Sequence, residues 1–494
     1  MNKKREKSLG ANAILNVLKQ CCSILFPLVS FPYITRVLGS EALGRYSFVD
    51  SVIGYFVLFA TLGIPTYAVR EGAGIRNDAK KINAFSAEVF SINCISMLIS
   101  AVILGVLVFC VPRFAVEKTL FFLLSIRIFT SVIGRDWINT IYENFFFITV
   151  RYIVFELAAL AMIFLFVKAP SDYMLYGGFL LLASAGPDIL NIFYTKRYVP
   201  LRLTRQLNLR KHLKPALYLF STTIAINIYV HSDITVLGFL RSDAEVGVYS
   251  LASKIYLAIE ACFNALISAM VPRLAFYLGT DEQEKYQALL HKTKNVLFLI
   301  MLPSMTGLFF LSKDIMTLLG GQEYTSGYHA LQILSAALFF AGLSTYYVKT
   351  LLIPNREDRY YFWVTIAAAT TNVVLNILFI PKMGIECAAM TTGIAEALSA
   401  GLAGVRSRRY IKQDKNGRNG NQLHSVLIGC FSIAAVCYGV GRLHLQPGIE
   451  MLICIVGSVM VYSVALLALR YGEACEILKK VRYMICGRTD NIDR

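Results

Sequence analysis

Long uninterrupted apolar runs restrict this chain to a membrane-spanning fold. Two of them cover residues 90–111 and 451–469, and each is long enough to cross a hydrocarbon layer of about 30 Å as a helix. Counting such runs predicts about fourteen transmembrane helices, since roughly 20 apolar residues mark each crossing. Charged residues make up 16% of the chain, below the roughly 25% of an average soluble domain. The expected fold class is therefore an all-α integral membrane protein.

The positive charge is distributed as a membrane protein requires. A net charge of +17 in a soluble chain would suggest nucleic acid as a partner. With the N-terminus in the cytoplasm, however, most Lys and Arg residues fall in cytoplasmic loops, as the positive-inside rule demands. The two most basic loops, residues 196–214 and 406–418, are placed to contact anionic membrane lipids. We therefore expect cytoplasmic termini and no nucleic-acid partner.

The first ten residues, MNKKREKSLG, resemble the positive n-region of a signal peptide. The apolar segment after them is too long for a signal peptide, and no small-residue cleavage site ends it. We therefore expect the first helix to be retained.

The two basic loops divide the predicted helices into groups of six, six and two. This division predicts an N-terminal lobe at residues 1–205, a second lobe at 206–415, and a helical hairpin with a tail at 416–494. Residues 43–47 (LGRYS) share Gly, Tyr and Ser with residues 246–250 (VGVYS), 203 residues further on, and both motifs open an even-numbered helix. Parallel repeats of this kind predict two pseudo-symmetric six-helix lobes around a central cavity, with a twofold axis along the membrane normal.

Polar side chains follow single faces of several predicted helices, at helical spacing. The candidates for lining the cavity or for ion coupling are Asn16, Gln20, Asp50, Ser51, Ser131, Asn227, Asp233, Ser250 and Ser253. For the Ser, Thr and Asn side chains the alternative is hydrogen bonding between helices, worth under about 1 kcal/mol each.

The repeat offset also relates polar faces to each other. It maps residues 250–254 onto residues 47–51, so equivalent faces of the second and eighth helices are both polar. We therefore expect these helices to face each other across the axis, with Asp50 opposite Lys254.

Five cations form the candidate substrate site. Lys19, Arg127 and Lys254 lie at mid-span, where a full charge is costly unless it faces a water-filled cavity. No carboxylate stands at helical spacing beside these three, which suits an anionic ligand such as a phosphate. Arg36 and Arg70, at helix ends, extend the path toward either surface. The alternative for these two is ordinary snorkelling to the headgroups.

Motifs for other chemistry are missing from the sequence. None of the six His is followed by Glu and no Gly-Lys pair exists, so H-E-x-x-H and P-loop motifs are absent. No outer loop has room for a catalytic domain, which disfavours a polysaccharide polymerase or a glycosyltransferase. The eleven Cys contain no C-x-x-C pair and suit apolar packing. We expect a non-enzyme with no catalytic residue, metal or cofactor, and with membrane carboxylates available for coupling to a proton or sodium gradient.

Six segments carry the pattern of a known family: FPYITRVLGSEALGRYSFVDS (31–51), TLGIPTYAVREGA (61–73), SDITVLGF (232–239), EVGVYSLASKI (245–255), MVPRLA (270–275) and PKMGIECAAMTTGIAE (381–396). In order and spacing they resemble the polysaccharide biosynthesis flippases, the Wzx-type exporters of O-antigen and capsule repeat units. These exporters form part of the multidrug, oligosaccharidyl-lipid and polysaccharide exporter superfamily.

The resemblance implies a multi-pass protein of the bacterial cytoplasmic (inner) membrane that acts in O-antigen, capsule or lipopolysaccharide biosynthesis. An oligosaccharide repeat unit on undecaprenyl diphosphate would cross from the inner to the outer leaflet by alternating access. On this view Lys19, Arg127 and Lys254 bind diphosphate or acidic sugar, and Asp50 and Asp233 couple the cycle. The implied partner is a downstream polysaccharide polymerase. A peptidoglycan lipid-precursor flippase and an ion-coupled multidrug exporter stay open as alternatives.

Overall fold

The described part of this chain is built of helices. The computed structural model describes residues 9–205, 207–411, 418–443, 447–469 and 471–472. Within these residues the secondary structure is α-helix with short 3-10 and π segments, and no strand occurs. The predicted all-α fold is confirmed.

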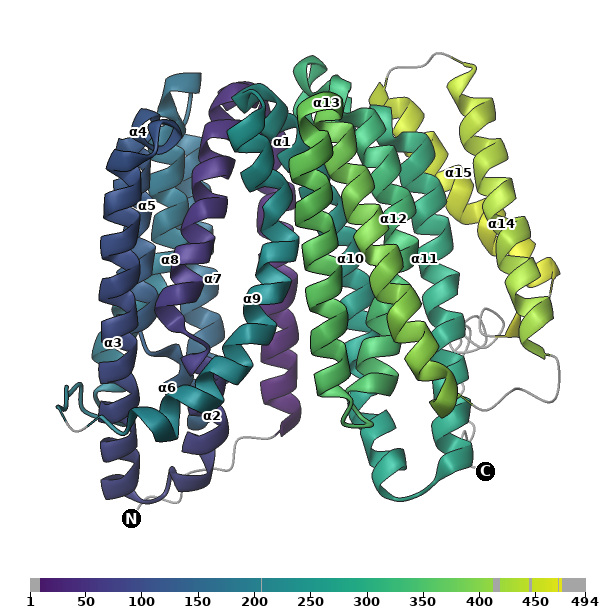
Figure 1. The fold of residues 1–494 in the computed structure, drawn as a ribbon. Coiled ribbons are helices and arrows are strands. Elements are labelled where there is room, and N and C mark those ends of the chain that lie inside the picture. The colour runs from purple at the N-terminus through teal and green to yellow at the C-terminus, as the bar shows by residue number, and fades with distance from the viewer. Residues whose placement is uncertain (1–8, 206, 412–417, 444–446, 470, 473–494) are drawn as a thin grey trace. The chain divides into compact units, whose positions relative to one another are not determined.

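The helices fall into two compact units. Unit 1 comprises the described residues up to Ser250 together with Ile380–Gly384, and unit 2 comprises Leu251–Phe379 and the described residues from Ile385 onward. The elements that lie in unit 1 are α1 (Leu9–Thr61), α2 (Ile64–Ile75), α3 (Ala79–Cys110), α4 (Pro112–Val116), α5 (Lys118–Ile133), α6 (Asp136–Ile141), α7 (Phe145–Phe166), η1 (Pro170–Asp172), α8 (Tyr173–Thr195), α9 (Leu209–Leu240) and the start of α10 (Asp243–Gly279) (Figure 1).

Unit 2 contains the remainder of α10 and the elements that follow it. These elements are α11 (Gln283–Gly320), η2 (Gln322–Gly327), α12 (Tyr328–Tyr347), the π-helical segment η3 (Val348–Leu352), α13 (Asp358–Ser407) except its residues in unit 1, η4 (Arg408–Tyr410), α14 (Arg418–Gly441) and α15 (Pro447–Ala468). The lobe boundaries expected at residues 205 and 415 stay a prediction. They follow from the basic loops and the internal repeat, whereas the two units are defined by compactness.

Eleven helices of the described residues are long and apolar enough to cross a membrane. Two long helices, α1 and α13, each contain one glycine with a non-helical backbone, Gly39 (φ 74°) and Gly384 (φ 62°), and therefore consist of two helices. Glycine adopts a positive φ without the steric cost that other residues pay. The apolar helix α5 has 16 residues and is too short to be among the eleven. Counting both halves of α1 and α13 and adding α5 is compatible with the predicted number of crossings.

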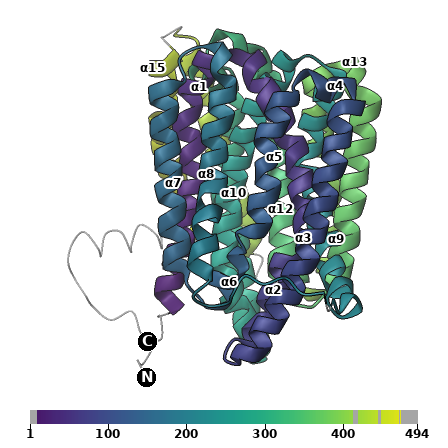
Figure 2. The same cartoon turned by 90° about the vertical axis from the view of Figure 1, so that its left-hand side faces the viewer.

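In unit 1 the other helices pack around α1. Helix α1 contacts α3, α5, α7 and α9, and α8 packs against both α5 and α7. Figure 2 shows α5, α7 and α8 running beside α1. This packing brings both halves of α1 within reach of polar residues on the neighbouring helices.

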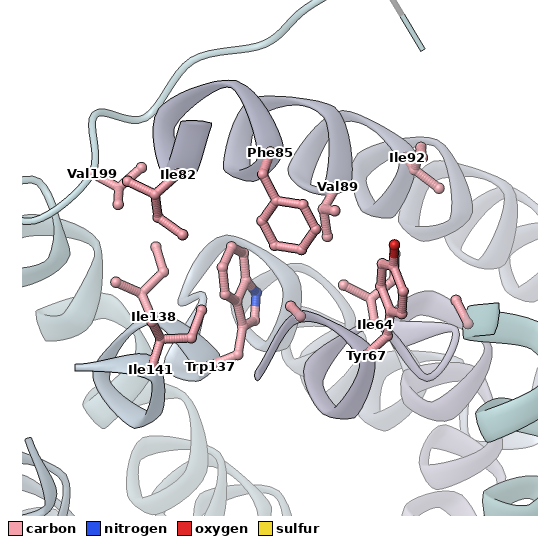
Figure 3. Close-up of a cluster of buried hydrophobic side chains, with 12 residues drawn as sticks. Ile64, Tyr67, Ile82, Phe85, Val89, Ile92, Trp137, Ile138, Ile141 and Val199 are labelled. Atoms are coloured by element: carbon pink, nitrogen blue, oxygen red, sulfur yellow. The ribbon is translucent and has the colours of Figure 1, made fainter. Parts of the chain in front are cut away.

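A hydrophobic cluster forms where α2, α3 and α6 meet. Tyr67 of α2, Phe85 and Val89 of α3, and Trp137 of α6 are buried in it, and Figure 3 shows these side chains gathered in one space. Ala216 of α9 also belongs to the cluster. Full burial of one large apolar side chain stabilises a fold by about 1.5–3 kcal/mol. The cluster therefore holds α6, and the turn that joins it to α5, in a defined position.

In unit 2 the last two helices form the expected C-terminal hairpin. Helices α14 and α15 pack on each other and on α11. Val426 and Cys430 of α14 are buried with Leu302 of α11, and Cys437 and Cys454 are buried with Leu311. These cysteines lie among apolar side chains, as their sequence surroundings predict.

Candidate functional site

The central polar contact of unit 1 joins Asp50 in the second half of α1 to Arg127 in α5. Nη1 of Arg127 donates a hydrogen bond to Oδ1 of Asp50, and the two form an ion pair. The side chain of Arg127 is 29% exposed and that of Asp50 is 37% exposed, so the rest of the chain does not fully enclose the pair. Asp50 lies about 16 Å along its helix from the turn at Gly39, which is about half of a 30 Å hydrocarbon layer. The pair therefore stands near mid-membrane depth.

This pairing corrects one expectation. Helical spacing predicts no carboxylate beside Arg127, but the packing of α1 against α5 places Asp50 there. The two residues are 77 positions apart, so no local pattern could reveal the contact. Whether Asp50 also lies opposite Lys254 stays a prediction, since Asp50 belongs to unit 1 and Lys254 to unit 2.

A second ion pair joins Asp136, the first residue of α6, to Arg151 in α7. Arg151 is 4% exposed, and its Nη1 donates to the carbonyl oxygen of Pro187 at 2.7 Å. That carbonyl belongs to the proline inside α8. The guanidinium thus bonds α8 while Asp136 offsets its charge. Neither Arg151 nor Asp136 is among the residues chosen from the sequence; a lone Arg in the apolar run of α7 was the available signal.

Asp188 of α8 connects the two ion pairs electrostatically. It interacts with Arg127, Arg151 and Asp136, and also with Lys19 of α1. A side chain at Gly134 would meet the Cβ atom of Asp188 at 2.8 Å, so the glycine permits α5 to approach α8 here. Charged groups from α1, α5, α6, α7 and α8 therefore form one polar region inside unit 1.

Buried amide groups fix the helices beside this region. Nδ2 of Asn139 donates to Oδ1 of Asn191 at 2.6 Å, and Nδ2 of Asn191 donates to the carbonyl oxygen of Gly134 at 2.5 Å. Arg135 donates to Oγ1 of Thr195 at 3.2 Å. These bonds attach the α5–α6 turn to α8, and they explain why the charged side chains are held at defined positions.

The predicted site residues of the first helix are placed in different ways. Lys19 is partly exposed, and its Nζ lies 5.1 Å from the ring centroid of Tyr152. Gln20 is exposed, and the side chain of Asn16 lies outside the described residues. Arg36, near the end of the first half of α1, is exposed. Of these residues, Lys19 reaches the polar region.

Most of the predicted hydroxyl and amide residues bond within or between helices. Ser131 donates to the carbonyl oxygen of Ile128, and Asn227 donates to that of Thr223. Ser51 lies 3.0 Å from the hydroxyl of Thr235 in α9. These contacts agree with the alternative to cavity lining, in which hydroxyl and amide side chains form hydrogen bonds that connect helices.

The remaining candidates are spread over both units. Arg70 is exposed and forms an ion pair with Glu71 at 3.1 Å, away from the polar region. Asp233 is buried and accepts a hydrogen bond from the hydroxyl of Tyr249 at 2.6 Å. Ser253 is buried and Lys254 is partly exposed, both in unit 2. The structure therefore brings Asp50 and Arg127 together, places Lys19 within electrostatic reach of the same region through Asp188, and leaves Arg36 and Arg70 at the surface.

The repeated motifs meet in a reciprocal contact between α1 and the start of α10, within unit 1. A Cβ atom at Gly44 would collide with the backbone of Asp243, and one at Gly247 would collide with the backbone of Ser40. The hydroxyls of Ser47 and Ser250 lie 2.9 Å apart. Each of these residues is 203 positions from its equivalent in the other motif, so the contact has the reciprocity of a local twofold axis.

Ion pairs surround this reciprocal contact. Arg113 of α4 pairs with Asp243, and Nε of Arg45 lies 3.6 Å from carboxylate oxygens of both Asp243 and Glu117. Arg45 also pairs with Glu41 at 2.5 Å. The charges attach the start of α10 to α1 and α4 at the end predicted to face outward.

The fold and the polar region define a multi-pass membrane protein of the transporter class. Apolar helices form the transmembrane part, and charged groups from several helices meet inside unit 1. More particularly, the chain belongs to the polysaccharide biosynthesis protein family, whose profile matches residues 9–277. The MatE family profile matches residues 219–378.

Known proteins of similar sequence are named for O-antigen transport or for capsular polysaccharide biosynthesis. The chain is 25% identical over 373 residues to the "Putative O-antigen transporter" of Escherichia coli (strain K12), covering 74% of this chain and 89% of that protein. It is 21% identical over 399 residues to "Capsular polysaccharide biosynthesis protein CapF" of Staphylococcus aureus, covering 79% of this chain and 96% of CapF.

Solved structures share the fold. The structure titled "Lipid II flippase MurJ, inward closed conformation" superposes with a TM-score of 0.74 at 14% identity, covering 93% of this chain and 99% of that one. An inward-facing multidrug resistance MATE family transporter of the MOP superfamily superposes with a TM-score of 0.57 at 17% identity, covering 81% and 94%. These likenesses show that the chain shares the fold of these two proteins.

Proposed function

We propose that this protein moves an oligosaccharide repeat unit on undecaprenyl diphosphate from the inner to the outer leaflet of the bacterial cytoplasmic membrane. Family membership and the names of its relatives support a glycan-lipid flippase. The observation that carries the proposal is the partly exposed Asp50–Arg127 pair near mid-membrane depth. Placing a charged side chain at this depth costs free energy. Binding of a charged headgroup during transport would explain why the charges of this pair are kept there.

Arg127 has hydrogen-bonding capacity for an anionic ligand. Its guanidinium carries five N–H groups, and of the described residues Asp50 alone accepts a hydrogen bond from it. The planar fork matches the oxygens of a phosphate. A diphosphate entering beside Asp50 would bind the remaining N–H groups, while Lys19, joined to the same region through Asp188, would supply a second charge.

The reciprocal contact of α1 with α10 supports alternating access. A close helix crossing at Gly44 and Gly247 leaves no room for a sugar headgroup between the two helices. In our proposal this contact closes the outward path and separates when the headgroup is released. Asp50 and Asp233 couple the cycle to a proton or sodium gradient. The termini are cytoplasmic, and a downstream polysaccharide polymerase receives the repeat unit.

Reconstitution tests this function. The full chain is placed in vesicles that contain a fluorescent undecaprenyl-diphosphate-linked glycan, and leaflet exchange is measured with and without an imposed ion gradient. Wild-type protein should accelerate exchange over empty vesicles. Arg127→Gln should slow it about tenfold, the loss expected for one charge-assisted hydrogen bond. Lys81→Gln is the matched control, because Lys81 is 72% exposed and remote from the polar region in the chain.

Two results would contradict the proposal. Wild-type vesicles that exchange the glycan lipid no faster than empty ones would exclude the function itself. A folded Arg127→Gln variant that exchanges at the wild-type rate would remove the role of the central pair.

A further inference from the structure

Lys349 stands in an unusual stretch of backbone in unit 2. It is the second residue of η3, a five-residue π-helical segment that follows α12. Such π segments are rare and occur frequently at functional sites. Its neighbours Val348, Thr350 and Leu351 are buried, whereas Lys349 itself is partly exposed. The π turn therefore presents one cation from an otherwise buried segment.

The ammonium group of Lys349 faces a polar stripe on α10. Its Nζ donates to Oγ of Ser268 at 3.0 Å, and it interacts electrostatically with Glu260. Glu260 in turn accepts a hydrogen bond from Nδ2 of Asn264 at 3.2 Å. Glu260, Asn264 and Ser268 are spaced by four residues and so share one face of α10.

Lys349 retains unused hydrogen-bonding capacity. An ammonium group carries three N–H donors, and among the described residues Ser268 accepts one of them. Among the residues that the structure describes, no carboxylate lies within ion-pair distance of the Nζ of Lys349. Glu260 interacts with it electrostatically from a greater distance. A cation held by a hydroxyl, with donors to spare on its exposed side, is suited to bind an anion from solution or from a membrane surface.

The depth of this group suits a headgroup. Ser268 lies about 37 Å along α10 from Asp243, and Lys349 lies about 32 Å along its helix from Tyr328, at 1.5 Å per residue. Both distances exceed the hydrocarbon thickness of about 30 Å. Lys349 and Ser268 therefore lie at headgroup level on the side predicted to be cytoplasmic, where the proposed substrate is loaded.

We propose that Lys349 and Ser268 form a binding site for the phosphate groups of a diphosphate, with Glu260 as the counter-charge that the bound anion replaces. This inference rests on the proposed function and adds a loading position to it. The same chemistry would serve a lipid diphosphate or free pyrophosphate. The rival explanation is a structural charge pair in which Lys349 and Glu260 only offset each other.

Binding is tested on the full chain in detergent, without any glycan. Thermal stabilisation is measured with farnesyl diphosphate and with inorganic pyrophosphate, for wild type, Lys349→Gln, Lys349→Arg and Glu260→Gln. Farnesyl diphosphate should stabilise wild type and Lys349→Arg, and Lys349→Gln should need about tenfold more of it. Glu260→Gln should bind at least as tightly as wild type, because the competing carboxylate is gone. Stabilisation by farnesyl diphosphate alone identifies a lipid source, and stabilisation by both probes identifies the diphosphate group itself.

The double variant Lys349→Gln/Glu260→Gln separates the site from a structural pair. If Lys349 belongs to an anion site, the double variant should bind farnesyl diphosphate as weakly as Lys349→Gln does. If Lys349 and Glu260 form a structural pair, the double variant should regain the stability and the binding of wild type. Lys285→Gln is the matched control, since Lys285 is an exposed cation paired with Glu282 near the start of α11. Equal stabilisation of wild type and Lys349→Gln, or none of wild type, would overturn the inference.

Leaflet exchange distinguishes the two proposals. If wild-type protein exchanges the glycan lipid and Lys349→Gln matches it at low substrate concentration, the loading site is wrong and the function stands. If wild type itself fails to exchange, the function fails whatever Lys349 binds in detergent.

Discussion

Ser47 and Ser250 are 203 residues apart in the chain, and their hydroxyl oxygens lie 2.9 Å apart. They occupy the same position in the two copies of a repeated motif, so each copy contacts the other through its own equivalent residue. The contact is close because Gly44 and Gly247, one turn earlier, have no side chains. A repeat recognised as a similarity in sequence is thus also a physical interface.

A disulfide at the serine pair should lock this interface. Two cysteines can be bridged when their Cβ atoms are about 3.5–4.5 Å apart, and hydroxyl oxygens 2.9 Å apart are compatible with that geometry. Ser47→Cys/Ser250→Cys should therefore cross-link under mild oxidation, as seen by peptide mass analysis. Leaflet exchange should stop and return on reduction, while each single variant stays active. A fully cross-linked protein that still exchanged would show that this contact need not open.

A methyl group at Gly247 should be destabilising, against the usual helix preference. Gly→Ala in a helix interior normally stabilises by about 0.5–1 kcal/mol. At Gly247 the new Cβ would collide with the backbone of Ser40, whereas at Gly54 of α1 nothing lies within 4 Å. Gly247→Ala should lower the thermal midpoint in detergent, and Gly54→Ala should leave it unchanged or raise it. The same sign at both positions would contradict the close crossing.

Removing the charge of Asp136 alone should destabilise the protein more than removing both charges of the Asp136–Arg151 pair. Asp136→Asn leaves Arg151, which is 4% exposed, without its ion-pair partner and with Asp188 as a remaining carboxylate in its surroundings; removing one partner of a buried pair costs up to about 3 kcal/mol. The double variant Asp136→Asn/Arg151→Met removes that charge and should recover part of the loss. Thermal unfolding in detergent measures both. A double variant less stable than Asp136→Asn would show that the bond of Arg151 to the Pro187 carbonyl outweighs the charge.

The stability of unit 2 should depend on pH through Glu357, which lies just before α13. Arg406 donates to both carboxylate oxygens at 3.0 Å and Tyr410 donates at 2.7 Å. These bonds, with that of Arg406 the strongest, lower the pKa of Glu357 from its ordinary value of 4.5. The folded carboxylate thus has the lower pKa, so its stabilisation is complete above about pH 4.5 and is lost as the pH falls through the folded pKa.

The variant Glu357→Gln isolates this effect. It should be less stable than wild type at neutral pH, and the difference should shrink as the pH falls below the ordinary pKa of the carboxylate. Thermal midpoints measured from pH 7 to pH 3 test this, with Glu284→Gln as an exposed control. A constant difference across that range would mean that the ionised carboxylate contributes nothing.

Local sequence patterns predicted the helices, their membrane character and the depth of their polar residues. Apolar runs are long enough to span a bilayer whatever their neighbours are, so the all-α class and the approximate number of crossings could be inferred from residues alone. Helical spacing likewise placed Lys19, Asp50 and Arg127 inside the membrane. The motifs around Gly44 and Gly247 were recognisable as a repeat for the same reason: similarity is a property of the chain.

Partners depend on which helices pack together, and helix periodicity carries no information about that. Arg127 is paired with a carboxylate from another helix, Arg151 donates to the carbonyl oxygen of Pro187 in α8, and the two repeat motifs are in contact with each other. Lys349 was overlooked because a lysine near the end of an apolar run looks like an ordinary interfacial residue. Its π-helical backbone and the hydroxyl facing it arise from packing between distant segments, where electrostatic and steric forces act through space and not along the chain.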